Sequence, residues 1–253
     1  MNQVKLVFLS SLIFSFFNTH VFAKSKAKTM RFTIVESWSE PYAFFDSNGN
    51  LTGGAMKDII EEIGKKVGVP VEFVYLSRNR VDAAMEKGAA EIRCYINEAW
   101  TNRPTDYLFS QPIFQTSNSI IWKKGRKPIT NRSDIEGKTI GTVAGYVHKS
   151  IDGLFKSGKA KRSDAVNEAM NTTLLLKDRI DYAIVETTSF NWTSKQSNEM
   201  GSKDVESFLL DVFKVKCSAL KKNSERFKLV ESALEKMKLL GVMRAIETKY
   251  GLK

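Results

Sequence analysis

Strand-like segments alternate with helix-like segments through the first third of the chain, and this alternation constrains the fold more than any other feature. Strand-like runs cover residues 31–38, 71–76 and 91–96, with helix-like runs between them. The first helix-like run places its apolar residues on one face, at Met56, Ile59, Ile60, Ile63 and Val67. Such alternation predicts an α/β layer with a largely parallel sheet.

The pattern starts again after about residue 118. Strand-like segments are expected at 119–124, 138–145, 180–186 and 208–220, and helices at 147–157, 163–177, 224–240 and in a shorter run ending near 250. AAMEKGAAEIRCYI at 83–96 resembles TLLLKDRIDYAIVE at 173–186, since each is a helix, a polar turn and a strand. Two similar α/β lobes with a cleft between them would explain both the restart and the length.

The N-terminus and the charge indicate an exported protein. A twelve-residue apolar run, 6–17, follows one lysine, and Ala23 ends a small-residue cleavage pattern, so residues 1–23 are predicted to be a cleavable signal peptide. The mature protein would be soluble and periplasmic. The net charge is +11, but the basic runs at 123–127 and 156–162 lack interleaved aromatics, so no nucleic-acid partner is expected.

The sequence lacks the residues and motifs that several kinds of catalytic and metal-binding site require. His148 is the one histidine left after cleavage, and no G-x-S-x-G or C-x-x-C motif occurs, so no catalytic triad, metal or cofactor is predicted. Glu36, Glu98 and Glu186 fall at or just past strand ends, where acids can catalyse, bind a cation or simply face solvent. Two cysteines remain, and the sequence leaves open whether they pair.

Five segments, in this order, carry a resemblance to a known family. They are PYAFFDSNGNLTGGAMKDI (41–59), TNRPTDYLFSQPI (101–113), IEGKTIGTVAGY (135–146), RIDYAIVE (179–186) and the C-terminal 221–251. The second is similar to the family's T-x-x-R followed by Phe-Ser-x-Pro. Over 30–253 the chain resembles the family 3 extracellular solute-binding proteins, the polar amino-acid-binding class.

The resemblance implies a two-lobed periplasmic-binding-protein fold of the type II flytrap kind. Two hinge crossovers are expected near 115–118 and 210–215. Lobe 1 would be 24–115 plus 214–253, and lobe 2 would be 119–209. We expect a monomer that closes on a small-molecule ligand and presents the closed form to an ABC transporter permease or a sensor.

The resemblance also assigns ligand-binding roles. Arg103 would pair with a ligand carboxylate through its planar fork, and Glu186 with an amino group. Glu36 would also face the ligand, while Trp38 and Tyr42 would wall the pocket. Each of these residues has a structural alternative. Arg103 could form a surface salt bridge, Glu186 could stabilise the start of a helix, and the others could lie at a strand end or in the core.

Departures from the family pattern put a standard amino acid in doubt. Tyr95, Asn97 and Glu98 stand where small hydroxyl residues are usual, and Tyr146 follows the glycine that opens the second lobe's helix. Arg78 and Arg80 replace the usual aromatic platform. Glu98 and Tyr146 therefore join the candidate ligand-binding residues of a reshaped pocket.

Three functions remain open at this point. The first is capture of a small polar, carboxylate-bearing ligand, an amino acid or analogue, for uptake or sensing; this protein would not be an enzyme. The second is a periplasmic dehydratase-like enzyme on the same fold, with Glu186 or Glu98 as general acid. The third is a basic protein that binds polyanions, whose affinity would fall steeply with salt.

Overall fold

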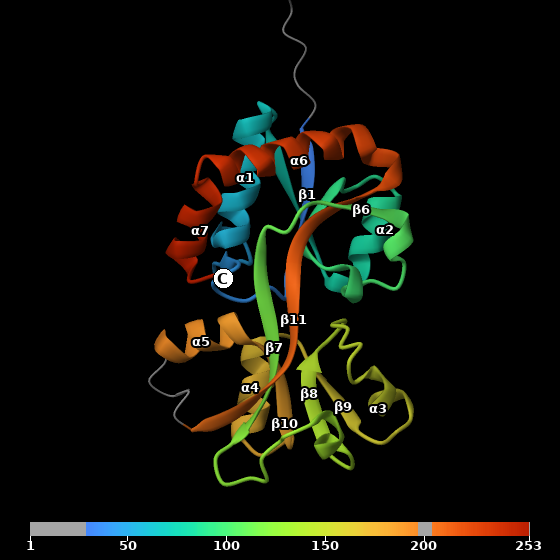
Figure 1. The fold of residues 1–253 in the computed structure, drawn as a ribbon, viewed down its shortest axis with the longest axis vertical. Helices are drawn as coiled ribbons and strands as arrows, with labels where there is room; N and C mark the ends of the chain where they lie inside the picture. Colours follow the sequence, from blue (N-terminus) through green and yellow to red (C-terminus); the bar gives the residue numbers. More distant parts are fainter. Residues whose placement is uncertain (1–28, 197–203, 253) are drawn as a thin grey trace, which may run out of the picture.

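The structure, a computed structural model, describes residues 29–196 and 204–252. Figure 1 shows two lobes, one above the other, bridged by two long strands, β7 (Phe114–Lys123) and β11 (Val205–Leu220). The predicted signal segment 1–23 and its cleavage after Ala23 lie outside the described residues. We retain the predicted lobe boundaries as a proposal, with β7 and β11 as the connections between the lobes.

One nine-stranded sheet runs through both lobes in the order β4-β1-β5-β11-β7-β10-β8-β9, with β6 paired to β11. The remaining strands of the upper lobe are β1 (Met30–Val35), β4 (Val71–Leu76), β5 (Ile92–Ile96) and β6 (Tyr107–Phe109). Those of the lower lobe are β8 (Thr139–Val143), β9 (Lys161–Ala165) and β10 (Tyr182–Glu186). A small hairpin, β2 (Phe44–Phe45) and β3 (Leu51–Gly53), stands apart.

The sheet is mixed, so the expectation of a largely parallel sheet holds only in part. Strand β1 pairs in parallel with β4 and β5, and β8 pairs in parallel with β9 and β10. The bridging strands pair antiparallel with each other and with β5 and β10, because the chain returns along β11 opposite to its outward path in β7. The order β4-β1-β5 on one side thus matches β9-β8-β10 on the other, which explains the weak internal repeat.

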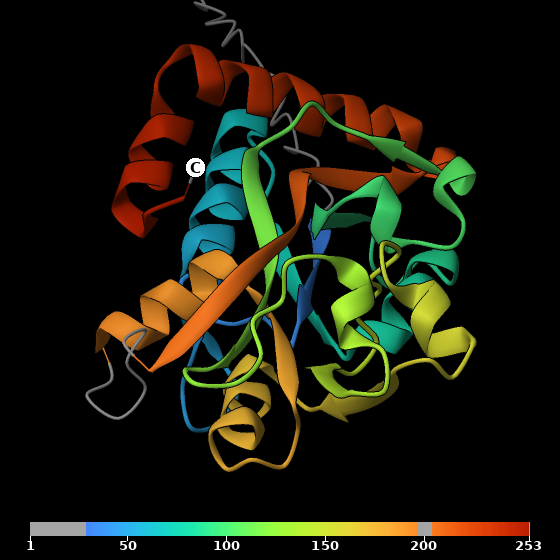
Figure 2. The ribbon, with the colours of Figure 1, turned by 60° about the horizontal axis from the view of Figure 1, so that its bottom comes forward.

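Helices cover the sheet much as their apolar periodicity predicts. In the upper lobe, α1 (Ala55–Val67) packs against α6 (Ser224–Leu239) and α7 (Val242–Tyr250), and α2 (Val81–Glu86) lies on the other side (Figures 1 and 2). The apolar face predicted for α1 is buried except for Val67, which is half-buried, and Gly68, whose φ of 73° favours glycine, caps the end of the helix. Five short 3-10 turns complete the described part of the chain: Arg78–Arg80, Glu98–Trp100, Pro104–Asp106, Arg132–Ile135 and Lys221–Asn223.

The lower lobe departs from the expected helices. Its helices are α3 (Asp152–Lys156), α4 (Glu168–Leu176) and α5 (Thr187–Gln196). The helix predicted over 163–177 starts only at Glu168, because 161–165 pairs with β8 as strand β9 and the Asn167 side chain accepts the Met170 N–H, which caps the helix. The helix predicted over 147–157 is reduced to α3, and α5 was not predicted.

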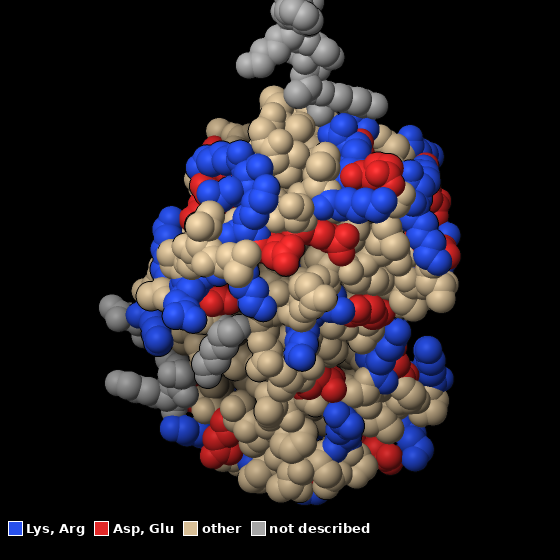
Figure 3. Space-filling view, turned by 45° about the horizontal axis from the view of Figure 1, so that its top comes forward, with Lys and Arg blue, Asp and Glu red and all other residues tan. Residues whose placement is uncertain are grey.

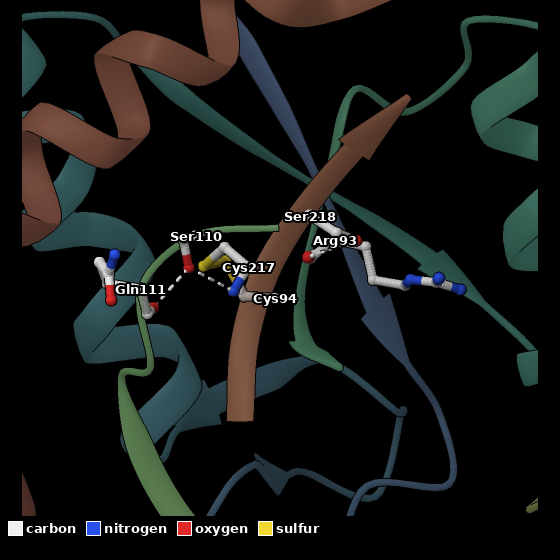
Figure 4. Close-up of a disulfide and its surroundings, with 6 residues drawn as sticks. All are labelled: Arg93, Cys94, Ser110, Gln111, Cys217 and Ser218. Atoms are coloured by element: carbon white, nitrogen blue, oxygen red, sulfur yellow. Dashed lines mark hydrogen bonds between the residues drawn. A yellow bond between two sulfur atoms is a disulfide. The ribbon is translucent and has the colours of Figure 1, made fainter. Parts of the chain in front are cut away.

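A disulfide joins Cys94 of β5 to Cys217 of β11, directly across the strand pair (Figure 4). This settles the pairing that the sequence leaves open. Both cysteines are fully buried. The Cys217 N–H also donates to Ser110 Oγ at 3.0 Å, and Ser110 Oγ donates to the Gln111 carbonyl at 2.8 Å. The disulfide therefore links β11 to β5 within the sheet of the upper lobe.

The surface in Figure 3 carries lysine and arginine side chains spread over the face in view, with acidic side chains among them. Many of the basic groups are ion-paired, as Lys57 is with Glu61 and Lys228 is with Glu225. The excess of basic charge is thus distributed over this face rather than concentrated on one part of it. Among residues 29–196 and 204–252, no helix is long and apolar enough to cross a membrane.

Candidate functional site

A cavity of about 490 Å³ lies between the two lobes. The upper lobe contributes the segment after β1 and the β2–β3 hairpin region, and the lower lobe contributes the start of α4 and one side of α5. The lining residues are Glu36, Trp38, Ser39, Glu40, Ala43, Phe45, Gly49, Asn167, Glu168, Ala169, Thr172, Ser189, Phe190, Thr193 and Ser194. A ligand here would contact both lobes.

The upper wall is built by the turn that ends β1. The Trp38 N–H donates to the Val35 carbonyl at 3.0 Å, which folds the chain back under the sheet. Trp38 is 4% exposed and packs edge-on against Tyr95, with ring centroids 5.5 Å apart. Its indole Nε1 is buried and has no hydrogen-bond partner among the described residues. Glu36, before the turn, is exposed and lines the cavity.

The lower wall carries a buried carboxyl group, Glu168, the first residue of α4. Its Oε1 accepts the Glu186 N–H at 3.4 Å, and its Oε2 is buried without a partner in the described part of the chain. Burial, together with the nearby charge of Glu186, raises the pKa of Glu168 to about 8. Glu168 is therefore mostly protonated at neutral pH, on a wall that a ligand would touch.

Glu186 ends β10 and begins the next helix. Its carboxylate accepts the N–H groups of Thr188 at 3.0 Å and Ser189 at 2.6 Å, so it caps the N-terminus of α5. The Thr116 hydroxyl on β7 also donates to it, and Thr116 Oγ1 lies 3.3 Å from the hydroxyl of Tyr42. This polar network joins the bridging strand to the core of the upper lobe and to the lower lobe.

Aromatic side chains fill the centre of the lobe interface. Tyr95 is the extra residue of a β-bulge, because Cys94 and Ile96 face the consecutive residues Cys217 and Lys216, and its φ is 60°. Bulges redirect side chains and are frequent beside active sites. The Tyr95 ring contacts those of Trp38, Tyr42, Trp100 and Phe114. A hollow of only about 30 Å³ remains between the rings of Tyr95 and Trp100 and the lower lobe.

Direct contacts hold the lobes together around this hollow. Arg78 Nε donates to the Gly145 carbonyl at 3.0 Å, and the Arg78 guanidinium lies 5.0 Å from the centre of the Tyr146 ring. The Tyr146 hydroxyl in turn donates to the Ser37 carbonyl at 3.3 Å.

A second bridge lies at the mouth of the cavity. The Trp192 indole Nε1 donates to Glu40 Oε2 at 3.1 Å, and the Trp192 ring stacks on Phe44. The two lobes therefore contact each other directly, both around the hollow and beside the cavity.

The candidates from the sequence fall in different places. Glu36 and Trp38 line the 490 Å³ cavity, while Glu186 and Tyr146 line the small hollow beside it. Tyr42 is fully buried in the upper core, where burial and the charge of Glu186 raise its pKa. Their roles toward a ligand stay predictions.

Two other candidates lie away from both spaces. Glu98 is ion-paired with Lys216. Its partial burial acts to raise its pKa, but the hydrogen bond from Lys216, a backbone hydrogen bond and the positive charge of Lys216 together outweigh this, and the pKa falls below its ordinary value. The Arg103 side chain is 48% exposed and pairs with Glu86 and Asp106. Neither Glu98 nor Arg103 lines the cavity or the hollow. The carboxylate-binding role of Arg103 stays a prediction.

Glu168 and Phe190 are cavity residues that the sequence analysis missed. Glu168 was assigned to the interior of a helix over 163–177, and Phe190 to no element. The available signal was Asn167 followed by an acid, which is typical of a helix N-terminus. Among the residues the structure describes, no group of three or more His, Cys, Asp or Glu side chains could hold a metal ion.

Comparison with known proteins identifies the family. The model of the bacterial extracellular solute-binding proteins, family 3, matches residues 33–253. The chain therefore belongs to this family, and its fold is the two-lobed periplasmic-binding-protein fold expected from the sequence.

Individual relatives are distant. A probable histidine-binding protein of Campylobacter jejuni is 26% identical over 141 residues, which cover 56% of this chain and 54% of the relative. The match thus spans about half of that relative's length. The L-cystine-binding protein TcyA of Bacillus subtilis is 22% identical over 242 residues, covering 91% of this chain and 84% of the relative. An ancestral arginine-binding protein bound to arginine is 26% identical, with a TM-score of 0.75, covering 89% and 99% of the two chains.

Proposed function

We propose that this protein is an exported solute-binding protein that captures a small polar ligand, an amino acid or an analogue with an amino group, in the cavity between its lobes. The observation that carries the proposal is the 490 Å³ cavity, which both lobes line. A space of this size suits a small organic molecule. Membership of a family whose relatives include a probable histidine-binding protein and an L-cystine-binding protein supports the ligand class.

Closure around the ligand would be the functional event. The contacts of Arg78 with Gly145 and of Trp192 with Glu40 join the two lobes, so they would have to break for the lobes to open. Bound ligand would then add its own contacts to both lobes and favour the closed form. An ABC permease or a sensor would recognise that form. We propose that the chain is a periplasmic monomer, exported by the segment 1–23.

One observation favours a second function, a dehydratase-like enzyme on the same fold. Glu168 has a pKa raised to about 8 and lines the cavity, so it could donate a proton to a bound substrate near neutral pH. Incubation with prephenate or arogenate, followed by ultraviolet absorbance, tests this. Turnover that disappears in Glu168→Gln would establish the enzyme, and no turnover would leave binding as the function.

Thermal unfolding with a panel of amino acids and amines tests the binding proposal. A ligand present at a thousand times its dissociation constant stabilises the folded protein by about 4 kcal/mol, which gives a clear rise in Tm. We expect at least one member of the panel to produce such a rise. A panel without any shift would contradict the proposal.

A further inference from the structure

The ionisable side chains of the described residues that line the cavity are all carboxylic acids. They are Glu36 and Glu40 from the upper lobe and Glu168 from the lower lobe, and no lysine or arginine of the described residues joins them. The chain as a whole has 39 lysines and arginines against 28 acids. The charge of the cavity lining is therefore opposite in sign to the net charge of the protein, and a negative lining favours a positively charged ligand.

Aromatic rings form part of the same walls. Trp38 and Phe45 come from the upper lobe, and Phe190 comes from α5. The face of an aromatic ring attracts a cation, and cages of such rings recognise ammonium groups. Acidic and aromatic side chains together are the surroundings that an organic cation needs.

A carboxyl oxygen without a hydrogen-bond partner among the described residues is a second observation that indicates a ligand, independent of which residue types line the cavity. Glu168 is 9% exposed, and its Oε2 has no hydrogen-bond partner in the part of the chain that the structure describes. The ionisable groups that face it are Glu186 on β10, Tyr146 after β8 and Tyr95 on β5. All three are acids, so none of these partners neutralises a charge on Glu168.

Among the described residues, the cavity has no basic side chain that could pair with a ligand carboxylate. Arg103 is paired with Glu86 on the outer surface. Arg78 borders the small hollow, where it contacts Gly145 and the ring of Tyr146. A carboxylate in the cavity would meet the carboxyl groups of Glu36 and Glu40 instead, and like charges disfavour it.

From this arrangement, and resting on the proposed function, we infer that the ligand is an organic cation recognised through its positive charge. It would be an amine, a guanidinium or a quaternary ammonium that needs no carboxylate. The cation would sit between the aromatic walls and Glu168, and it would displace the Glu168 proton to solvent, so that one proton is released for each ligand bound near neutral pH.

Matched pairs of ligands test the inference by calorimetry: agmatine with arginine, cadaverine with lysine, and histamine with histidine. The decarboxylated member of a pair should bind at least as tightly as the amino acid. Amino acids that bind ten-fold or more tightly than their decarboxylated partners would overturn the inference but keep the proposed function. Failure of both amines and amino acids to bind would contradict both.

Two variants locate the charge that recognises the ligand. Glu168→Gln should bind the tightest-binding amine ten-fold or more weakly and should release no proton on binding. Proton release is measured as the difference in binding enthalpy between two buffers of different ionisation enthalpy. The matched control Glu72→Gln makes the same change on exposed β4 and should leave both unchanged. Equal binding and proton release in Glu168→Gln and the unaltered protein would overturn the inference.

Discussion

Glu168 gives the structure a stability that depends on pH in an unusual direction. In the unfolded chain this carboxyl loses its proton near its ordinary pKa of 4.5, whereas in the folded protein it keeps the proton up to about pH 8. Between these values the folded state holds one more proton than the unfolded state, so the free energy of unfolding falls as the pH rises. The two pKa values imply a loss of about 4 kcal/mol between pH 5 and pH 8.5.

Glu168→Gln removes this term, because a glutamine side chain does not titrate. Urea unfolding of the variant and the unaltered protein at pH 5 and at pH 8.5 gives the difference in stability at each pH, and the effects of all other groups cancel. The variant should gain about 4 kcal/mol relative to the unaltered protein over this interval. Glu72→Gln on the exposed side of β4 controls for the loss of one carboxylate. An equal difference at both pH values would refute the reasoning about Glu168.

Three further predictions follow from other parts of the structure. Burial lowers the pKa of His148 to about 3. The stability that the neutral ring contributes is therefore complete above pH 6.5, and the free energy of unfolding falls by about 1.4 kcal/mol per pH unit between pH 6.5 and pH 3. In acid unfolding, His148→Asn should lack this pH dependence. The double variant Cys94→Ser/Cys217→Ser opens a loop with a sequence separation of 123 and should lose about 2–5 kcal/mol in urea unfolding, and an unchanged midpoint would contradict this. Arg103→Ala should leave ligand affinity unchanged, since Arg103 pairs with Glu86 outside the cavity; loss of binding by calorimetry would restore the role predicted from the sequence.

Local patterns predicted much of the fold. The strand at 71–76 has the predicted bounds, and the apolar face of α1 is the buried one. The failures came where tertiary pairing outweighs local preference: 161–165 forms a strand because β8 offers a parallel edge, although the residues around it suit a helix. The family assignment did not depend on these bounds, since it rested on the order of five motifs.

The site was predictable only in part. Glu36 could be found because it follows the end of a buried strand, where ligands collect in α/β folds, whereas Trp38 was proposed from the family resemblance; both line the cavity. Arg103 shows the limit of a motif: Thr101 precedes it by two residues where the family motif has three, and its side chain turns toward Glu86, 17 residues earlier. No local pattern shows that the cavity is acidic, because its charged residues come from two lobes that meet only in the folded chain.

The central claim is that ligand binds in the cavity between the lobes, and a pair of matched substitutions tests it most directly. Ala169 lines the cavity and is exposed on α4, so Ala169→Trp would fill the space without disturbing the core. Ala83 is exposed on α2 in the upper lobe and lines neither the cavity nor the hollow, so Ala83→Trp makes the same change elsewhere. In calorimetric titration with the best ligand of the panel, we predict that Ala169→Trp loses binding and Ala83→Trp keeps it. Undiminished binding to Ala169→Trp would contradict the account.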